Sequence, residues 1–174
     1  PSSVPMGCGM FFCRHPEIVS QSFRAQAAYM PARSEDDTYD PYTHSVQWSR
    51  RFSGLKLFMS IAQHGEKGYA AMIERQAHMG DMLRDRLLSS GWSVLNDTPL
   101  PLVCFTREGL DIAAFLTAMR ERQIAWISEA RLGSQPVLRA CITSFRTTER
   151  DVEWVVEQMN LLIQDLRSAV AVTA

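Results

Sequence analysis

A polar stretch that runs directly into a helical pattern constrains this chain more than any other feature. Residues 31–41 begin and end with proline and carry four acidic side chains. Such residues bury little apolar surface, and proline disfavours regular structure. Residues 50–64 then carry an apolar face at helical spacing: Phe52, Leu55, Met59 and Ala62. A polar loop of this length in a compact domain is typically a functional lid or a disordered segment. Tyr29 before it and Arg50 and Arg51 after it favour a lid that carries chemistry.

Composition excludes several classes of protein. The formal net charge is −1 with 21% charged residues, so there is no basic footprint for nucleic acid. No apolar run approaches the roughly 20 residues that span a bilayer. No charged segment followed by an apolar stretch stands at the start, so no secretory signal is expected. We therefore predict a cytoplasmic protein that binds neither nucleic acid nor membrane.

The four cysteines lie in apolar, strand-like surroundings and lack the spacing of a metal site. Cys8 and Cys13 are five residues apart, without a histidine pair beside them. Together with Cys104 and Cys141 they are predicted to be buried free thiols, and no metal site is expected.

The rest of the pattern predicts helices and strands in alternation. Residues 9–14 read as a short buried strand and residues 15–26 as a helix. Gly65 is predicted to end the helix over 50–64, and a second amphipathic helix covers 66–89. Further strands are expected at 92–95, 102–106, 124–131 and 137–143, and a helix is expected over 111–122. A capping box formed by Thr148 and Asp151 is predicted to begin a last helix, whose end is expected to fray over 171–174. This order predicts a small α/β domain with a mainly antiparallel sheet, covered by helices on one side.

Four segments match one known family in their order along the chain. They are Ser-Val-Pro-Met-Gly-Cys-Gly-Met-Phe-Phe-Cys-Arg at 3–14, Gly-Glu-Lys-Gly-Tyr at 65–69, Leu-Val-Cys-Phe at 102–105, and Val-Leu-Arg-Ala-Cys-Ile-Thr-Ser with Arg-Thr-Thr-Glu at 137–149. With the loop and helix described above, they resemble the pyridoxal-phosphate-dependent group II amino-acid decarboxylases, the aromatic-amino-acid decarboxylase family. The resemblance covers nearly the whole chain.

The resemblance implies the C-terminal part of a fold-type I, aspartate aminotransferase-like enzyme. Residues 1–64 would end the large cofactor-binding domain, with a mobile catalytic loop at 29–46, and residues 65–174 would form a helix and the small domain. The family's cofactor lysine precedes the segment that matches residue 3. Only Lys56 and Lys67 are present, and neither fits that position. We therefore expect the chain to act with an N-terminal half that carries this lysine and pyridoxal 5′-phosphate, in a dimer of the complete enzyme.

The resemblance also assigns roles to residues. Tyr29 matches the loop tyrosine that protonates the substrate carbon after carbon dioxide leaves; a phenol is a competent donor and a closed lid excludes water. Tyr39 and Tyr42, in the same loop, are alternatives. Trp48 and Ser49 would approach the cofactor in the partner subunit. Met6, Gly7 and Cys8 would line the substrate pocket.

Other readings remain open at this stage. Arg50 and Arg51 serve equally well as solvated or interface residues, and His44, His64 and His78 read as surface residues. A noncatalytic interaction module would explain the missing lysine, but it would not need the lid tyrosine. A pyridoxal-phosphate aminotransferase or another lyase of the same fold type is a third reading. The reaction we predict is release of carbon dioxide from an L-amino acid to give an amine, with the isolated chain inactive.

Overall fold

The computed structural model describes residues 7–23, 44–47 and 49–173, which fall into two compact units divided between Gln63 and His64. The assignment of these units to a large and a small domain remains a prediction.

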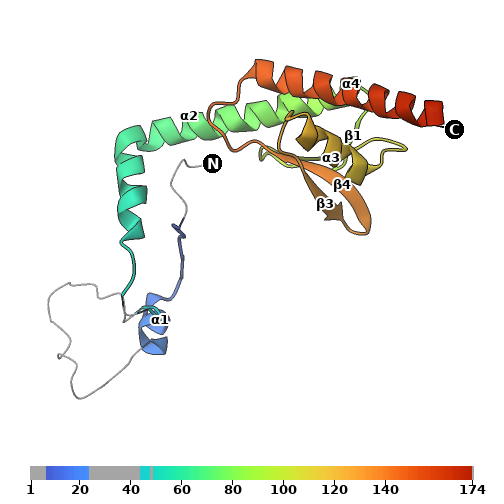
Figure 1. The fold of residues 1–174 in the computed structure, drawn as a ribbon. Coiled ribbons are helices and arrows are strands. Elements are labelled where there is room, and N and C mark those ends of the chain that lie inside the picture. Colours follow the sequence, from blue (N-terminus) through green and yellow to red (C-terminus); the bar gives the residue numbers. More distant parts are fainter. Residues whose placement is uncertain (1–6, 24–43, 48, 174) are drawn as a thin grey trace. The chain divides into compact units, whose positions relative to one another are not determined.

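The first unit has a short helix and the start of a long one. Helix α1 covers Pro16–Ser22, with proline in its first turn, where a missing N–H costs no hydrogen bond (Figure 1). The predicted strand at 9–14 is wrong for this structure. Met10, Phe11 and Phe12 are 65–84% exposed, and the described part of this unit has no strand with which they could pair.

Helix α2 covers Ser53–Ser89 and is interrupted where the sequence predicts. Gly65 has φ 64° and ψ 178°, a conformation that leaves the helix and that only glycine adopts readily. The helix begins at Ser53 rather than Arg50. It ends at Ser89, and Gly91 follows in the left-handed region with φ 79°. The amide of Trp92 then donates to the carbonyl of Leu87 at 3.0 Å, which closes the helix end.

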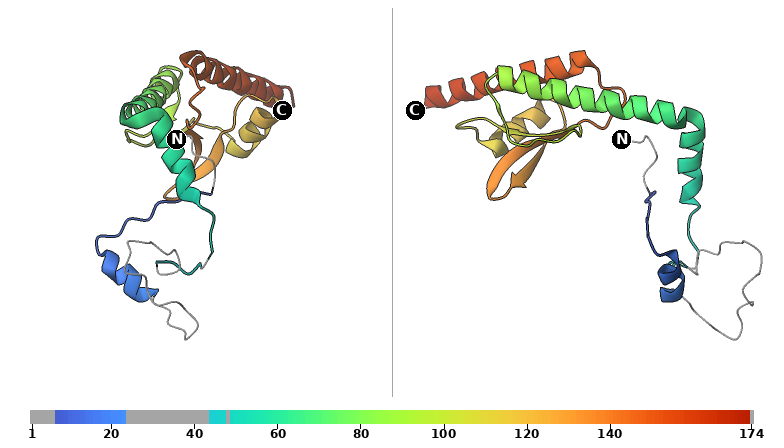
Figure 2. Two further views of the ribbon diagram at one scale, coloured as in Figure 1. Left: turned by 90° about the vertical axis from the view of Figure 1, so that its left-hand side faces the viewer. Right: turned by 180° about the vertical axis from the view of Figure 1, so that it is seen from behind.

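The second unit contains a four-stranded antiparallel sheet. Its strands are β1 (Ser93–Val94), β2 (Leu102–Thr106), β3 (Ser128–Leu132) and β4 (Gln135–Cys141), in the spatial order β1-β2-β4-β3. Two further helices, α3 (Ile112–Glu121) and α4 (Glu149–Thr173), complete the unit (Figure 2). The predicted elements are all present, with β1 and β3 shorter than predicted. Helix α4 continues to Thr173, through residues 171–173.

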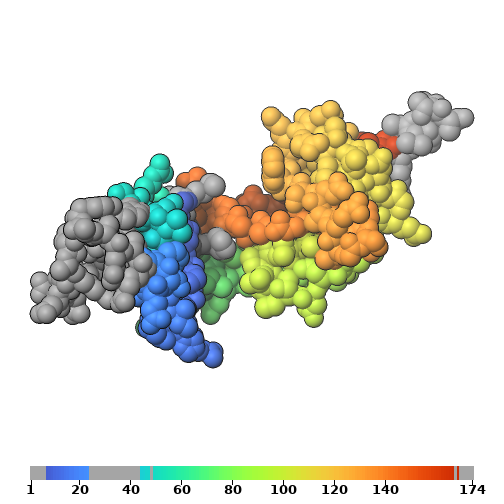
Figure 3. All heavy atoms as spheres, turned by 90° about the horizontal axis from the view of Figure 1, so that it is seen from below, coloured from blue at the N-terminus to red at the C-terminus, as the bar shows by residue number. Residues whose placement is uncertain are grey.

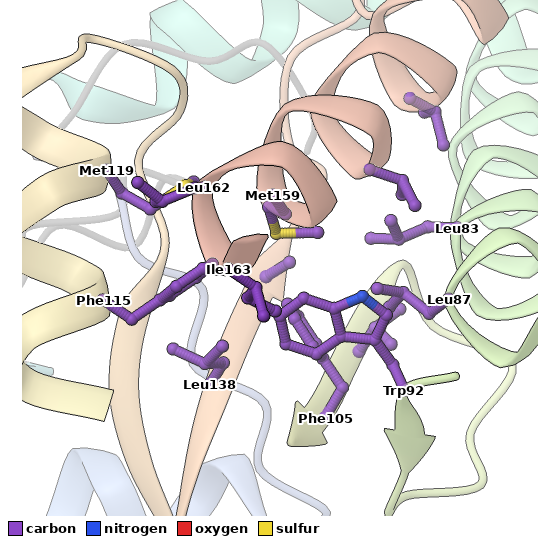
Figure 4. Packing of buried hydrophobic residues seen from close by; sticks show 14 of the residues in the cluster. Leu83, Leu87, Trp92, Phe105, Phe115, Met119, Leu138, Met159, Leu162 and Ile163 are labelled. Atoms are coloured by element: carbon purple, nitrogen blue, oxygen red, sulfur yellow. The ribbon is translucent and has the colours of Figure 1, made fainter. Parts of the chain in front are cut away.

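The core lies between one face of the sheet and the helices. In the register of the sheet, Val103 lies opposite Ala140 and Phe105 opposite Leu138, so these side chains share a face. They form one cluster with residues of α2, α3 and α4 (Figure 4). The helical members labelled there are Leu83, Leu87, Phe115, Met119, Met159, Leu162 and Ile163.

Both predicted helix starts are confirmed. The Asp111 carboxylate accepts a hydrogen bond from the amide of Ala114 at 3.0 Å, which caps α3. Before α4, the Asp151 carboxylate accepts from the amide and from the hydroxyl of Thr148, each at 2.8 Å. These two hydrogen bonds hold the pKa of Asp151 below its ordinary value of 3.8, and the bond from the Thr148 amide has the larger effect.

The prediction of four buried thiols is confirmed only for Cys104. All four thiols are free, but Cys8 is half-buried, and Cys13 and Cys141 are exposed. Cys13 belongs to the exposed segment at 9–14. Cys141 follows the core residue Ala140 in β4, and successive side chains of a strand point to opposite faces.

Helix α2 holds the connection between β1 and β2 through Gly80 and Arg84. The Arg84 guanidinium donates to the carbonyls of Thr98 at 2.7 Å, Leu100 at 2.9 Å and Leu102 at 3.1 Å. One turn earlier, the backbone of Pro101 approaches Gly80 so closely that a Cβ there would lie 2.9 Å from its Cα.

We expect Gly80→Ala to destabilise the chain. The new methyl group meets backbone on one side, so relief requires the connection or the helix to move, at a cost of about 1–3 kcal/mol. Gly54 in the same helix is the matched control, since a Cβ there would meet only the Phe52 ring at 3.6 Å. Urea unfolding of both alanine variants checks this. Equal midpoints for Gly80→Ala and the parent would contradict it.

Among the described residues, no helix is long and apolar enough to cross a membrane.

Candidate active-site segments

The predicted site residues divide between described and undescribed parts of the chain. Met6, Tyr29 and Trp48 lie outside the described residues, as do the alternatives Tyr39 and Tyr42. Gly7, Cys8 and Ser49 are described, and all three belong to the first unit. For these three residues the structure shows the contacts and the exposure.

Gly7 is joined to the beginning of α2. The Ser53 hydroxyl, on the first residue of the helix, donates to the carbonyl of Gly7 at 2.9 Å. Gly7 has φ 88°, and a Cβ there would lie 3.9 Å from Nζ of Lys56, one turn along the helix. A side chain at position 7 would therefore be strained in its backbone and would sit against this ammonium group. The segment with Gly7 and Cys8 is thus held at the start of α2.

Ser49, Arg50 and Arg51 form a short run of donors just before α2. All three are exposed. In the described part of the chain, their side chains make no hydrogen bond or ion pair. A hydroxyl and two guanidinium groups are the donor types that bind a phosphate group. The run is therefore available to an anionic ligand.

The sequence did not predict the contact between α1 and His44. The Ser20 hydroxyl and Nε2 of His44 lie 2.8 Å apart, and His44 is half-buried. His64 and His78 are exposed as predicted. His64 stacks edge-on against Tyr69 with ring centroids 5.8 Å apart, and His78 lies 3.8 Å from the Glu149 carboxylate. Isolated polar pairs like Ser20 and His44 leave no periodic signal from which they could be found.

Both lysines of the chain lie on α2. Lys56 is half-buried near Gly7, and Lys67 is exposed two residues after Gly65. No group of three histidine, cysteine, aspartate or glutamate side chains is placed to hold a metal ion within the described ranges.

A comparison with protein families decides the assignment. The family model described as the pyridoxal-dependent decarboxylase conserved domain matches residues 2–108. The chain belongs to this family. The match includes the segments at Gly7 and Ser49, both helical parts of α2, and β2.

Solved structures support the fold of this family member. Oryza sativa TDC with PLP and tryptamine has a TM-score of 0.75 at 21% identity over 84% of this chain and 33% of its own. Catharanthus roseus tryptophan decarboxylase in complex with L-tryptophan has a TM-score of 0.67 at 20% identity, and the match covers 73% of this chain and 29% of its own. Mouse CSAD in apo form has a TM-score of 0.69 at 15% identity, and the match covers 84% of this chain and 34% of its own.

These likenesses confirm the predicted fold class, the C-terminal part of a fold-type I enzyme with a small antiparallel sheet and helices. The chain spans about a third of the length of these relatives.

Proposed function

We propose that this family member is the C-terminal part of a pyridoxal-phosphate-dependent amino-acid decarboxylase, which releases carbon dioxide from an L-amino acid to give an amine. The family match over residues 2–108 carries the proposal. The likeness of the chain to the structures of tryptophan decarboxylase and CSAD supports it. We expect the complete enzyme to be a cytoplasmic dimer, in which an N-terminal half supplies the cofactor lysine.

The described residues fit one end of the cofactor. Ser49, Arg50 and Arg51 offer the hydroxyl and guanidinium donors that suit its phosphate group, and all are exposed. Lys56 and Lys67 stand on a helix, outside the position that the family uses for the cofactor lysine. When bound, pyridoxal phosphate supplies an electron sink for the bond that breaks in the substrate. This chain would contribute Ser49, together with Trp48, to holding it.

A loop tyrosine would complete the reaction by delivering a proton. Tyr29 is the preferred residue, because its flanking Ala-Ala and Met-Pro match the family; Tyr39 and Tyr42 are the alternatives. The phenol would hold its proton until the substrate carbon has lost carbon dioxide, and then donate it to that carbon. The loop at 29–46 would exclude water during this step.

The remaining contribution would be the wall of the substrate pocket. Met6, Gly7 and Cys8 are proposed to line it, and the bond from Ser53 to the Gly7 carbonyl supports a fixed position for this wall. The positive φ of Gly7 explains why no side chain stands there.

We expect the isolated chain to decarboxylate no amino acid, because both of its lysines lie on α2. Mixing it with an N-terminal half that carries the family's lysine should restore release of carbon dioxide. The measurement is carbon dioxide released with pyridoxal phosphate and a panel of amino acids, for each half alone and for the mixture.

Three results would count against this expectation. The first is turnover by the isolated chain together with a stoichiometric, borohydride-reducible label on Lys56 or Lys67. The second is a mixture that binds the cofactor but transaminates, which would favour an aminotransferase of the same fold type. A mixture that assembles but neither binds the cofactor nor turns over would favour a noncatalytic interaction module.

A further inference from the structure

Strand β3 forms an edge of the sheet in the second unit. It pairs with β4 alone, and the spatial order β1-β2-β4-β3 leaves its outer side without a neighbouring strand among residues 64–173. The β3–β4 hairpin reaches the surface of its unit (Figure 3). An edge strand presents unpaired backbone donors and acceptors, which can pair with a strand from another chain.

The register of the hairpin shows which backbone groups face outward. Leu132 lies opposite Gln135 across the two-residue turn Gly133–Ser134, with Gly133 at φ 61°. In such a hairpin the flanking pair exchanges both hydrogen bonds, and such pairs then alternate along the strands. Pro136 stands opposite Arg131, a position that needs no N–H. The N–H and C=O groups of Glu129 and Arg131 therefore point away from β4.

The outward-facing residues carry opposite charges. Glu129 and Arg131 are exposed, and within the described ranges neither side chain makes an ion pair. If a second β3 lies antiparallel with its Ala130 opposite Ala130, each Glu129 stands opposite the other copy's Arg131. Pairs of opposite charge across antiparallel strands are attractive. The same register joins the outward-facing backbone groups of these two residues.

Only one register has this complementarity. A shift of two residues in one direction places Glu129 opposite Glu129, and a shift in the other direction places Arg131 opposite Arg131. Like charges directly opposite each other are destabilising. Charged side chains on an edge usually discourage pairing, but here they discourage the two neighbouring registers and favour the one centred on Ala130.

We propose that the edge of β3 pairs antiparallel with β3 of a second copy of this chain, centred on Ala130, so that the sheet continues across the contact. Apolar residues flank the pairing. Trp126 is 88% exposed two residues before Ser128, and Leu132 is exposed at the other end of the strand. In this register Trp126 stands diagonally across from the second copy's Leu132, within reach of an aromatic side chain. The contact is independent of the proposed decarboxylase function.

A cysteine at the centre of the pairing tests the geometry. Two residues facing each other across a non-hydrogen-bonded antiparallel pair have Cα atoms about 4.5 Å apart, within the range of a disulfide. We expect Ala130→Cys, in a Cys13→Ser and Cys141→Ser background, to give a covalent dimer under mild oxidation of the 174-residue chain. Ser134→Cys is the matched control, since residue 134 is exposed in the same hairpin but far from its copy. Equal cross-linking of the two variants, or none, overturns the proposal.

Charge reversal tests the recognition. In each single variant, Glu129→Arg or Arg131→Glu, two attractive pairs become two repulsive ones, so cross-linking through Ala130→Cys should slow by about tenfold. The double variant Glu129→Arg with Arg131→Glu restores both attractive pairs and should cross-link within about twofold of the parent rate. This pairing would be excluded if the single charge reversals left the cross-linking rate unchanged, or if the double variant cross-linked no faster than the single variants.

Discussion

Replacing Tyr29 by phenylalanine in the assembled enzyme is expected to lower amine formation by about 10²–10⁴-fold, the usual contribution of a general acid. The substitution keeps the ring and removes only the hydroxyl that is proposed to donate the proton, so substrate binding should change little. Loss of carbon dioxide needs no proton from this residue. Protonation of the substrate carbon would therefore be slow. In air, oxygen should then oxidise part of the substrate to aldehyde, ammonia and peroxide instead of leaving it to form amine.

The measurement is the ratio of amine to aldehyde under oxygen for three variants made in parallel. Tyr39→Phe and Tyr42→Phe are the controls, since both tyrosines lie in the same sequence segment, 29–46. They should keep most of the activity. If Tyr29→Phe forms amine at the parental rate, Tyr29 is not the proton donor. If one of the other two variants shows the loss instead, that tyrosine is the donor.

The second unit could be predicted from sequence because its elements are long or strongly marked. The helical part of α2 after Gly65 and helix α4 carry apolar stripes over several turns, and β2 has the bounds that its apolar run predicts. Asp111 and Thr148 mark helix starts by side-chain chemistry that acts within three residues. For β1, β3 and β4 the strands were predicted and only their ends were misplaced.

The first unit was harder to predict because its described apolar residues are not buried, although apolar runs usually indicate buried strands. Met10, Phe11 and Phe12 have the composition of a buried strand, yet they are exposed. A strand is stabilised by its neighbours across the sheet, so a strand-like sequence without a partner does not form one.

The candidate site rests on motif matches more than on contacts. The bond from Ser53 to Gly7 and the contact of Ser20 with His44 join residues 46 and 24 positions apart. Neither pair has a periodic or compositional signal, because a single serine hydroxyl fits many partners. The positive φ of Gly7 could have been suspected from glycine itself, but not its closeness to Lys56.

Trp92 should be the most costly side chain to remove from the core of the second unit. It is 3% exposed, although it follows directly after Gly91 at the end of α2. Its ring stands edge-on to Phe105 at 5.4 Å and to Phe115 at 5.7 Å, which joins the sheet to α3. Its Nε1 donates to the Asn160 side chain at 2.9 Å, which joins the same ring to α4. One side chain therefore contacts three elements that are distant in sequence.

We expect Trp92→Ala to lower the free energy of unfolding by about 3–5 kcal/mol, the cost of emptying a large aromatic site in a core. Trp92→Phe is the matched control: it keeps most of the ring contacts but leaves the Asn160 oxygen with only the Arg107 guanidinium, at 3.1 Å, as donor. It should cost about 1–2 kcal/mol. Urea unfolding followed by far-ultraviolet circular dichroism measures both. Because Asn160 keeps that second donor, a phenylalanine variant as unstable as the alanine variant would show that the hydrogen bond, and not the packing of the ring, joins α4 to the sheet.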